Sequence, residues 1–450
     1  MEGRLVILLL FSGFLTCSIS CNRNLPSQYK ENANAVDPPD LDEAKKIQWL
    51  SKNTISIHSI DPQDDDFTDL MSLKDVIGKA RIVMLGEASH GDGATICAKQ
   101  RLVRFLHEAM GFDVLAWEAH FFYMEEINKE LKSDKPMWAE NAWIDAGLMK
   151  SFGQYSRATQ HTARPLYHTG FDIIFGFPMA SGIDHYRKRL FEFLDKEGSG
   201  VASPSDIQKI GNFLDNLHHS EKDRVELQTA IGRIRSNLHK KAKTTQNHRE
   251  MDYYAKTLDD LAAYQEELAL EESPDTQAII FRSKKMGENL IWLANKWYPD
   301  QKIIVWAANR HVARNVSSIE MLIPEIQLPL DYREMGDFLY KEFGDSVYSV
   351  AFVTYQGSRG RENEEPYSVN APSGSIESLW HNTNQKYGFV DFRSLSCDHW
   401  LRKPLVESAD GGAIERSNWT NVFDGMFYIN TMFPVTKSGD IPEAIRTKRN

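Results

Sequence analysis

Apolar runs that end in small or ionisable residues occur three times in the chain, at residues 82–85, 112–117 and 302–307. Short continuous apolar runs are typical of buried strands, and open α/β sheets present their chemistry where such strands end. The side chains that follow the three runs are those of Glu87 and His90, of Glu118, and of Asn309 and His311. We therefore expect the three strand ends to meet in one pocket.

A helix is expected between the first two strands. Leu102, Phe105, Leu106 and Ala109 recur at the spacing of one helical face, and Gly111 is placed to end the helix. Residues 82–118 therefore predict a strand, a loop, a helix and a second strand, an order that favours parallel pairing.

The same periodicity predicts most of the remaining elements. Strands are expected at residues 166–174, 347–355, 388–392 and 426–433, and helices at 41–53, 70–78, 334–343, 375–384 and in a stretch ending at 297. The aromatic-rich segment 121–167, which includes Trp138 and Trp143, is expected to be helical and to form one wall of the pocket. The polar, Gly-rich residues 356–374 are expected to form a loop over the site.

Residues 181–272 differ in character from the rest. They are highly charged, contain few β-branched clusters and repeat apolar positions every 3.6 residues, and Ser203 followed by Pro204 is typical of a helix start. We predict a helical insertion in an α/β core made of residues 41–180 and 273–450. The expected fold is α/β, with a mainly parallel central sheet flanked by helices.

The N-terminal residues predict export. Arg4 precedes an apolar block that is too short to span a bilayer, so residues 1–21 are interpreted as a signal peptide. Cys21 resembles the acylated cysteine of a bacterial lipoprotein, with Cys17 as a competing position and ordinary secretion as the alternative. The polar residues 22–40 are expected to be a tether. The protein is thus expected in the cell envelope or periplasm, with a lipid on Cys21 as its only membrane contact.

Composition narrows the possible partners. A net charge of −11 argues against nucleic acid as a partner. Cys97 and Cys397 could pair in an oxidising compartment, but each is more typical of a small buried residue. No CxxC or CxxH pair is present, which argues against structural zinc.

Glu87 and His90 are the strongest candidates for catalysis. A neutral imidazole can take a proton from water near neutral pH, and a neighbouring carboxylate can fix its tautomer and stabilise the imidazolium. A structural alternative is that Glu87 caps the following helix and His90 is an ordinary loop residue. Ser89 is a weak nucleophile candidate, because the segment lacks the first glycine of a G-x-S-x-G elbow.

Glu118 follows Trp117, where burial would raise its pKa unless a cation faces it. Lys99 or Arg101 could be that cation, or either could hold a substrate anion or a developing oxyanion. His311 is a third candidate at the oxyanion. Two histidines and two glutamates would also suit a divalent metal, but no HExxH spacing supports this, and no cofactor is expected.

These residues resemble the erythromycin esterase family in order and spacing. The matching segments are residues 86–91, 99–101, 111–112, 117–118 and 306–311, with weaker matches at Gly170 to Asp172, at Arg282 with Met286 and Asn289, and at Met335 to Gly336. The resemblance implies an α/β core with a helical insertion and a deep cleft, and hydrolysis of macrolactone rings. It places the family's general base on His90, its supporting carboxylates on Glu87 and Glu118, and its basic residue on Lys99.

One position departs from the family pattern. Ala308 stands where the family carries the first histidine of a Trp-x-His-Asn-x-His motif. Loss of a group that polarises a developing oxyanion typically costs about 2.7–4 kcal/mol in the barrier. The expected function is therefore hydrolysis of an ester or macrolactone, with either a different substrate or reliance on Asn309 and His311. The alternatives are an envelope-anchored binding protein that has lost catalysis, and a metal-dependent hydrolase.

Overall fold

A computed structural model describes residues 42–133, 147–175, 181–217, 220–271, 276–322, 329, 332–361, 364–408, 413–435 and 440–446. The expected signal peptide, the tether, Trp138 and Trp143 lie outside these residues. The chain forms two compact units, one made of residues up to 116, 134–167 and 290–450, and the other of residues 117–133 and 168–289. Each unit is described by itself below.

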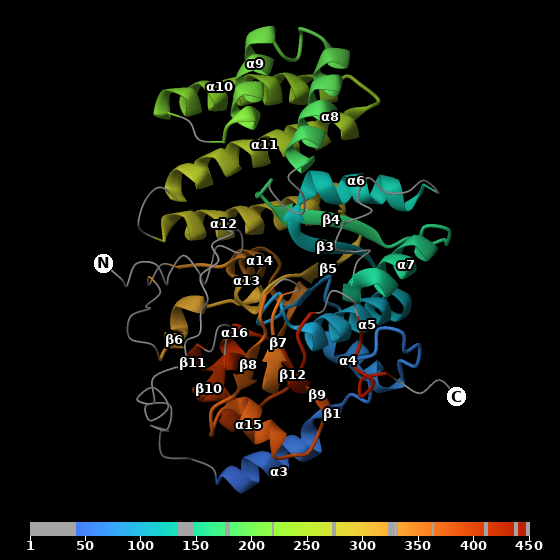
Figure 1. Cartoon of the computed structure of the whole chain (residues 1–450), viewed down its shortest axis with the longest axis vertical. Coiled ribbons are helices and arrows are strands. Elements are labelled where there is room, and N and C mark those ends of the chain that lie inside the picture. The colour runs from blue at the N-terminus through green and yellow to red at the C-terminus, as the bar shows by residue number, and fades with distance from the viewer. Residues whose placement is uncertain are drawn as a thin grey trace. The chain divides into compact units, whose positions relative to one another are not determined.

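The first unit contains most of a nine-stranded sheet (Figure 1). The strand order is β1-β9-β12-β7-β2-β5-β3-β4, and β8 pairs with β7. The strands are β1 (Ile55–Ser56), β2 (Ile82–Leu85), β3 (Phe112–His120), β4 (Tyr167–Asp172), β5 (Lys302–Trp306), β7 (Val347–Arg359), β8 (Tyr367–Asn370), β9 (Tyr387–Asp391) and β12 (Gly425–Met432). The central strands β12, β7, β2 and β5 are parallel to their neighbours in this set, whereas β1, β9 and β8 add antiparallel pairs. The α/β fold with a mostly parallel sheet is confirmed.

The residues of β2 explain its central place. All four of its side chains are buried, with exposed fractions of 1% or less, so both faces of the strand are covered. A strand buried on both faces must carry a continuous apolar run, which is the pattern that predicted it. β2 pairs with β5 and β7, and β3 comes only after β5 in the sheet. Local sequence order therefore suggested the wrong neighbour, because β5 lies between β2 and β3.

Helices flank the sheet of the first unit. They are α3 (Glu43–Asn53), α4 (Leu73–Ile77), α5 (Gly93–Met110), α7 (Lys150–Thr159), α13 (Asn309–Val312), α14 (Met335–Phe343), α15 (Ile376–His381) and α16 (Trp419–Val422), with short 3-10 turns at Thr68–Leu70, Gly147–Met149, Val316–Ser318, Gly344–Ser346 and Trp400–Arg402. Helix α5 ends at Gly111, whose φ of 80° is the left-handed conformation that favours glycine. The predicted strand, helix and strand of residues 82–118 are confirmed.

The expected loop at residues 356–374 is partly wrong. β7 continues to Arg359, and β8 pairs with it in an antiparallel hairpin. Gly357 has a φ of 118°, and a Cβ there would lie 2.2 Å from the carbonyl oxygen of Met432. This glycine permits close approach of two strands, although in the sequence it resembled a loop residue.

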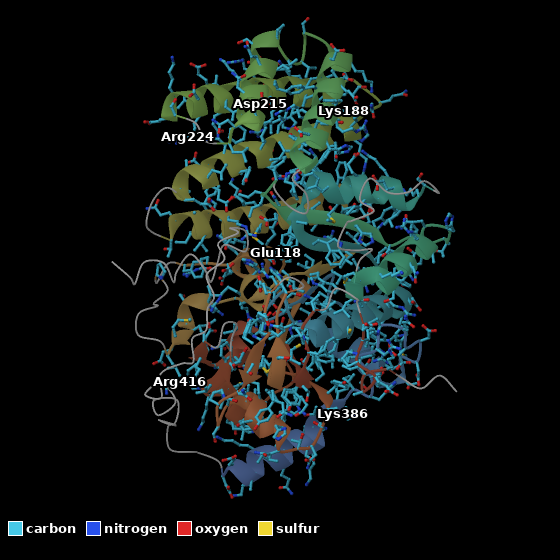
Figure 2. The ribbon with its side chains drawn as sticks, in the orientation of Figure 1. Glu118, Lys188, Asp215, Arg224, Lys386 and Arg416 are labelled. Atoms are coloured by element: carbon cyan, nitrogen blue, oxygen red, sulfur yellow. The ribbon has the colours of Figure 1, made fainter. Side chains whose placement is uncertain are left out.

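A smaller antiparallel sheet was not predicted. It has the order β10-β11-β6, with β10 (Leu405–Ser408), β11 (Ile414–Ser417) and β6 (Glu320–Met321). Its strands alternate buried and partly exposed positions, and Arg416 on β11 forms a two-pronged ion pair with Glu320 on β6 (Figure 2). Charged residues such as Glu407 and Glu415 occupy its buried face, which removed the apolar alternation that predicts a strand.

The second unit is mainly helical (Figure 1). Its helices are α6 (Phe121–Leu131), α8 (Ser181–Glu197), α9 (Pro204–Asp215), α10 (Glu221–Ala242), α11 (His248–Glu271) and α12 (Gln277–Trp292), which a π-helical turn at Leu293–Trp297 extends into the first unit. Helix α9 begins with the predicted Ser203 cap, in a capping box with Asp206. Four helices therefore occupy the described part of residues 181–272, as expected. Their grouping as a separate insertion stays a prediction, because this compact unit also contains α6 and most of β4.

The two cysteines among the described residues, Cys97 and Cys397, are not bonded to each other. Cys97 is fully buried in α5, as expected, and burial raises the pKa of its thiol. Cys397 is exposed, contrary to expectation. Within the described ranges, no helix has the length and apolar content needed to cross a bilayer.

Candidate active site

The end of β2 brings Glu87 and His90 into direct contact. Nδ1 of His90 lies 2.6 Å from Oε1 of Glu87. The Glu87 side chain is 5% exposed, whereas that of His90 is 42% exposed, so water reaches the imidazole but not the carboxylate. If Glu87 accepts the Nδ1 proton, the basic lone pair of a neutral His90 lies on Nε2.

The second carboxylate oxygen of Glu87 has two donors. Nζ of Lys99 lies 2.7 Å from Oε2, and the indole nitrogen of Trp306 donates to the same oxygen at 3.0 Å. Burial acts to raise the pKa of Glu87, but the charge of Lys99 and the contact with His90 outweigh it and hold this pKa below its ordinary value. Glu87 is therefore a carboxylate at neutral pH.

Asn309 ties the end of β5 to the end of β2. Its backbone nitrogen donates to the carbonyl oxygen of Glu87 at 2.7 Å. Its side chain accepts from the backbone nitrogen of Phe352 at 3.0 Å and donates to the carbonyl oxygen of the same residue at 2.9 Å. The structure thus places the ends of β2 and β5 together, with the Asn309 amide occupied by backbone groups.

His311 forms a second pair of imidazole and carboxylate. Its Nδ1 lies 3.0 Å from Oε2 of Glu334, and the hydroxyl of Tyr332 donates to the other oxygen of Glu334. Glu334 is completely buried, and the side chain of His311 is 11% exposed. Glu334 was not identified from the sequence, because no apolar run or motif singles it out from the other glutamates.

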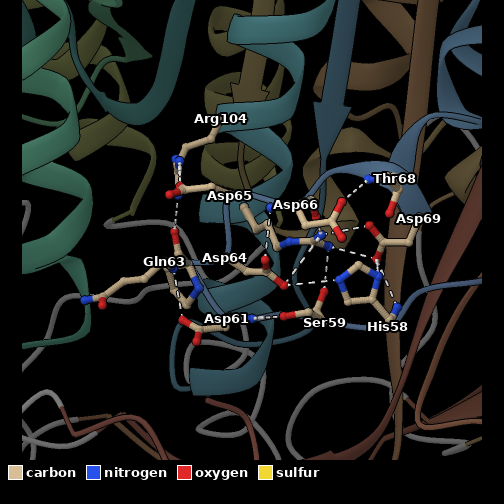
Figure 3. Close-up of polar contacts among 12 residues, drawn as sticks. His58, Ser59, Asp61, Gln63, Asp64, Asp65, Asp66, Thr68, Asp69 and Arg104 are labelled. Carbon is tan, nitrogen blue, oxygen red and sulfur yellow. Dashed lines mark hydrogen bonds and ion pairs between the residues drawn. The ribbon is translucent and has the colours of Figure 1, made fainter. Parts of the chain in front are cut away.

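Arg101 lies in a different cluster of the first unit (Figure 3). Its guanidinium donates to both carboxylate oxygens of Asp69, at 3.0 and 2.8 Å, and to the carbonyl oxygens of Ser59 and Asp66. The side chain is 1% exposed. Arg101 therefore stabilises the segment that precedes η1 (Thr68–Leu70), and its guanidinium is directed at this segment, which takes no part in the contacts of Glu87.

Glu118 and Asp172 belong to the second unit, where Arg282 joins them (Figure 2 labels Glu118). Arg282 binds both oxygens of Asp172, at 3.0 and 2.6 Å, and lies 3.4 Å from Glu118. The cation that faces Glu118 is therefore Arg282, whereas Lys99 and Arg101 were the expected partners. The predicted meeting of Glu118 with the other two strand ends stays a prediction.

Two further groups were considered as nucleophile or metal ligands. The hydroxyl of Ser89 accepts a hydrogen bond from the backbone nitrogen of Gly91 at 3.3 Å, as a turn residue does. Across the described part of the chain, no group of three or more His, Cys, Asp or Glu side chains is arranged to hold a metal ion.

A polar cavity of about 270 Å³ lies near these residues in the first unit. It is lined by Gln63 and Asp65, by Gln100 and Arg104 of α5, and by Phe152 and Tyr155 of α7. The ring of Phe152 lies 6.5 Å from that of Trp306, centre to centre. The cavity is thus one aromatic ring away from the indole that contacts Glu87.

Comparison with known proteins identifies the family. The model of the erythromycin esterase family matches residues 107–432. YbfO of Bacillus subtilis (strain 168), which is named as a hydrolase, is 25% identical over 419 residues, covering 86% of this chain and 91% of that protein. Erythromycin esterase type II of Escherichia coli is 22% identical over 419 residues, covering 85% and 96%.

Solved structures have the same fold. A Bacillus cereus protein superposes with a TM-score of 0.74 at 17% identity, covering 88% of this chain and 99% of that one. A mutant of the erythromycin esterase EreC, in its open conformation, superposes with a TM-score of 0.58 at 16% identity, covering 86% and 99%. Since the family model spans far more than half of the sequence, the chain belongs to the erythromycin esterase family, a membership that indicates a hydrolase.

Proposed function

We propose that this protein hydrolyses a carboxylic ester or a macrolactone, with His90 as the general base that activates water. The observation that carries the proposal is the 2.6 Å contact between Nδ1 of His90 and Oε1 of Glu87. A buried, ionised carboxylate behind a half-exposed imidazole is the arrangement that proton transfer from water requires.

The reaction would proceed in two steps. Nε2 of His90 takes a proton from water while the water oxygen bonds to the acyl carbon, and the carbonyl oxygen becomes an oxyanion. Collapse of this tetrahedral intermediate breaks the bond to the leaving oxygen, which takes the proton back from the imidazolium. Glu87 stabilises the imidazolium between the steps. A lactone yields one hydroxy acid, and an open ester yields an acid and an alcohol.

The oxyanion requires a donor other than Lys99 or Arg101, because both direct their charges at carboxylates of the protein itself. His311, whose Nδ1 faces Glu334, is the remaining candidate among the predicted residues. The resemblance to the family also supports a role for Glu118, which Arg282 accompanies in the second unit.

The test compares wild type with His90→Ala on simple esters and on a macrolactone of the erythromycin type. We expect the variant to lose about 10²–10⁴-fold in kcat, the contribution typical of a general base. Full activity in the variant would remove His90 from the mechanism. Loss of activity on chelation, with recovery after addition of a divalent ion, would instead favour the metal-dependent reading.

A second candidate function is capture of a ligand without turnover. Ala308, in place of the family histidine, favours it, because a methyl group neither donates a hydrogen bond nor transfers a proton. Long incubation with a macrolide followed by mass spectrometry separates the two functions. Unchanged bound macrolide supports capture, and a hydrated product supports hydrolysis.

We further propose that the protein is exported and anchored through a lipid on Cys21. Residues 1–21 support this through their charge, apolar block and terminal cysteine. Metabolic labelling with a fatty acid should mark the wild type but not Cys21→Ala. Labelling that persists in Cys21→Ala and disappears in Cys17→Ala would move the anchor to Cys17.

A further inference from the structure

The carboxylate of Glu87 is held from two sides. Oε1 contacts His90, and Oε2 accepts from both Lys99 and Trp306. A carboxylate with partners on only one oxygen can rotate about its terminal bond, because that torsion is broad. Donors on both oxygens restrict the rotation, so the orientation of the acid toward His90 depends on the partners of Oε2.

Trp306 is itself firmly placed. It is the last residue of β5, directly beside Leu85 of β2 in the parallel register, and it is 6% exposed. Nζ of Lys99 lies 4.3 Å from the centre of the indole ring and donates to the carbonyl oxygen of Ala307 at 3.3 Å. The sheet therefore fixes the backbone of Trp306, and Lys99 packs on its ring, so that the indole N–H points at Oε2.

We propose that Trp306 is a positioning residue for the Glu87–His90 pair, an inference that rests on the proposed hydrolysis. Its N–H holds the Glu87 carboxylate so that Oε1 remains on Nδ1 of His90, and His90 keeps its acceptor on Nε2. Lys99 has a related role. It supplies the balancing charge for Glu87 and acts through that carboxylate, because its ammonium is completely buried.

The main test is Trp306→Phe, which keeps an aromatic ring beside Lys99 and Phe152 but removes the N–H. We expect kcat to fall about ten- to a hundredfold with little change in KM, the size expected for loss of a hydrogen bond to a charged group. The acidic limb of the pH–rate profile should move to higher pH, because Glu87 loses a donor that favours its ionised form.

Trp419→Phe is the matched control. Trp419 is equally buried, lies in the same unit, and donates its indole N–H to the carbonyl oxygen of Leu405 at 2.8 Å. Its removal costs a comparable hydrogen bond in a place that does not contact Glu87. We expect a lower melting temperature but an unchanged pH–rate profile. A pH–rate profile that moves equally in both variants would overturn the proposal.

Nuclear magnetic resonance tests the contact without any turnover. The Nδ1 proton of His90, bonded to Glu87, should give a low-field signal in wild type and in Trp419→Phe, and should be lost or shifted in Trp306→Phe. Should Trp306→Phe fail to fold, Glu87→Gln should still shift the indole N–H signal of Trp306 and leave that of Trp419 in place. If no ester is hydrolysed but these signals behave as expected, the proposed function fails and the positioning role stands. Unchanged signals for His90 or Trp306 would overturn the positioning role.

Discussion

Gly86 occupies a place in which no side-chain atom fits. A Cβ there would lie 2.1 Å from Oδ1 of Asn309 and 3.0 Å from the carbonyl oxygen of Val350. Asn309 can come so close to the end of β2 only because residue 86 lacks a side chain. The glycine that ends the apolar run in the sequence thus has a packing role as well as a conformational one.

Gly86→Ala should therefore disrupt the junction of β2 and β5. We expect a loss of about 1–3 kcal/mol in the free energy of unfolding, because an added methyl group in a filled site forces its neighbours to move. Gly232→Ala in α10 is the control, since a Cβ there meets nothing within 4 Å. That control should gain about 0.5–1 kcal/mol from helix propensity. Equal effects in urea denaturation would contradict the packing role.

Lys99 and Glu87 make stability depend on acidic pH. The folded pKa of Glu87 lies below its unfolded value, so the pair contributes stability above the unfolded pKa, near 4.3, and loses it as pH falls through the folded value. Lys99→Met leaves a buried carboxylate without its cation and should cost about 3–5 kcal/mol at pH 7. Lys99→Arg, which keeps the charge, should cost less. A Met variant as stable as the Arg variant in urea denaturation at pH 7 would show that the charge is unimportant.

Helices α11 and α12 give the second unit a different dependence on pH. Glu267 on α11 is buried beside Arg282 and Asp172, and burial raises its pKa to about 8. The folded state therefore binds a proton that the unfolded state releases above about pH 4.3. Stability should fall as pH rises from that value to about 8, by about 1.4 kcal/mol per pH unit at most, and level off beyond.

Glu267→Gln should remove this slope, because an amide does not titrate. Urea unfolding of wild type and variant at pH 6, 7 and 8 measures the difference, with Glu266→Gln on the same helix as the control. Equal slopes in wild type and Glu267→Gln would mean that Glu267 is already ionised in the folded protein.

Elements with a clear apolar pattern were predictable from the sequence, and their neighbours were not. The four buried residues of β2 and the helical face of Leu102, Phe105 and Leu106 report local structure directly. The place of β5 between β2 and β3 depends on contacts more than 180 residues apart, which periodicity does not encode. The hairpin of β7 and β8 was missed because its polar, glycine-containing residues mimic a loop.

At the scale of the whole chain, the candidate site was predictable only in part. The contact of Glu87 with His90 followed from their spacing after a strand. The roles of Trp306, Glu334 and Arg282 did not, because each is fixed by a distant partner: Trp306 by Glu87, Glu334 by His311, and Arg282 by Asp172. Arg101 shows the reverse, since its closeness in sequence to Lys99 suggested a shared site, whereas one helix directs the two cations at different carboxylates.

The two compact units predict the result of excising the helical segment. Within the second unit, Phe122 of α6 packs on Tyr186 of α8, Phe121 packs on Tyr253 of α11, and Glu126 contacts His185. Replacing residues 181–271 by a short linker would expose these rings of α6. We therefore expect the shortened chain to be insoluble or to lack cooperative unfolding, as judged by soluble yield and circular dichroism. A soluble, cooperatively folding product would support the predicted independent insertion.

The unequal burial of Cys97 and Cys397 provides chemical access to the protein. A maleimide dye should couple to Cys397 in the native state, which gives a site-selective attachment point for fluorescence or immobilisation. Cys97, two residues before Lys99 in α5, should react only when that helix opens. The rate of its modification in a Cys397→Ser background would then serve as a clock for local opening beside the proposed catalytic pair.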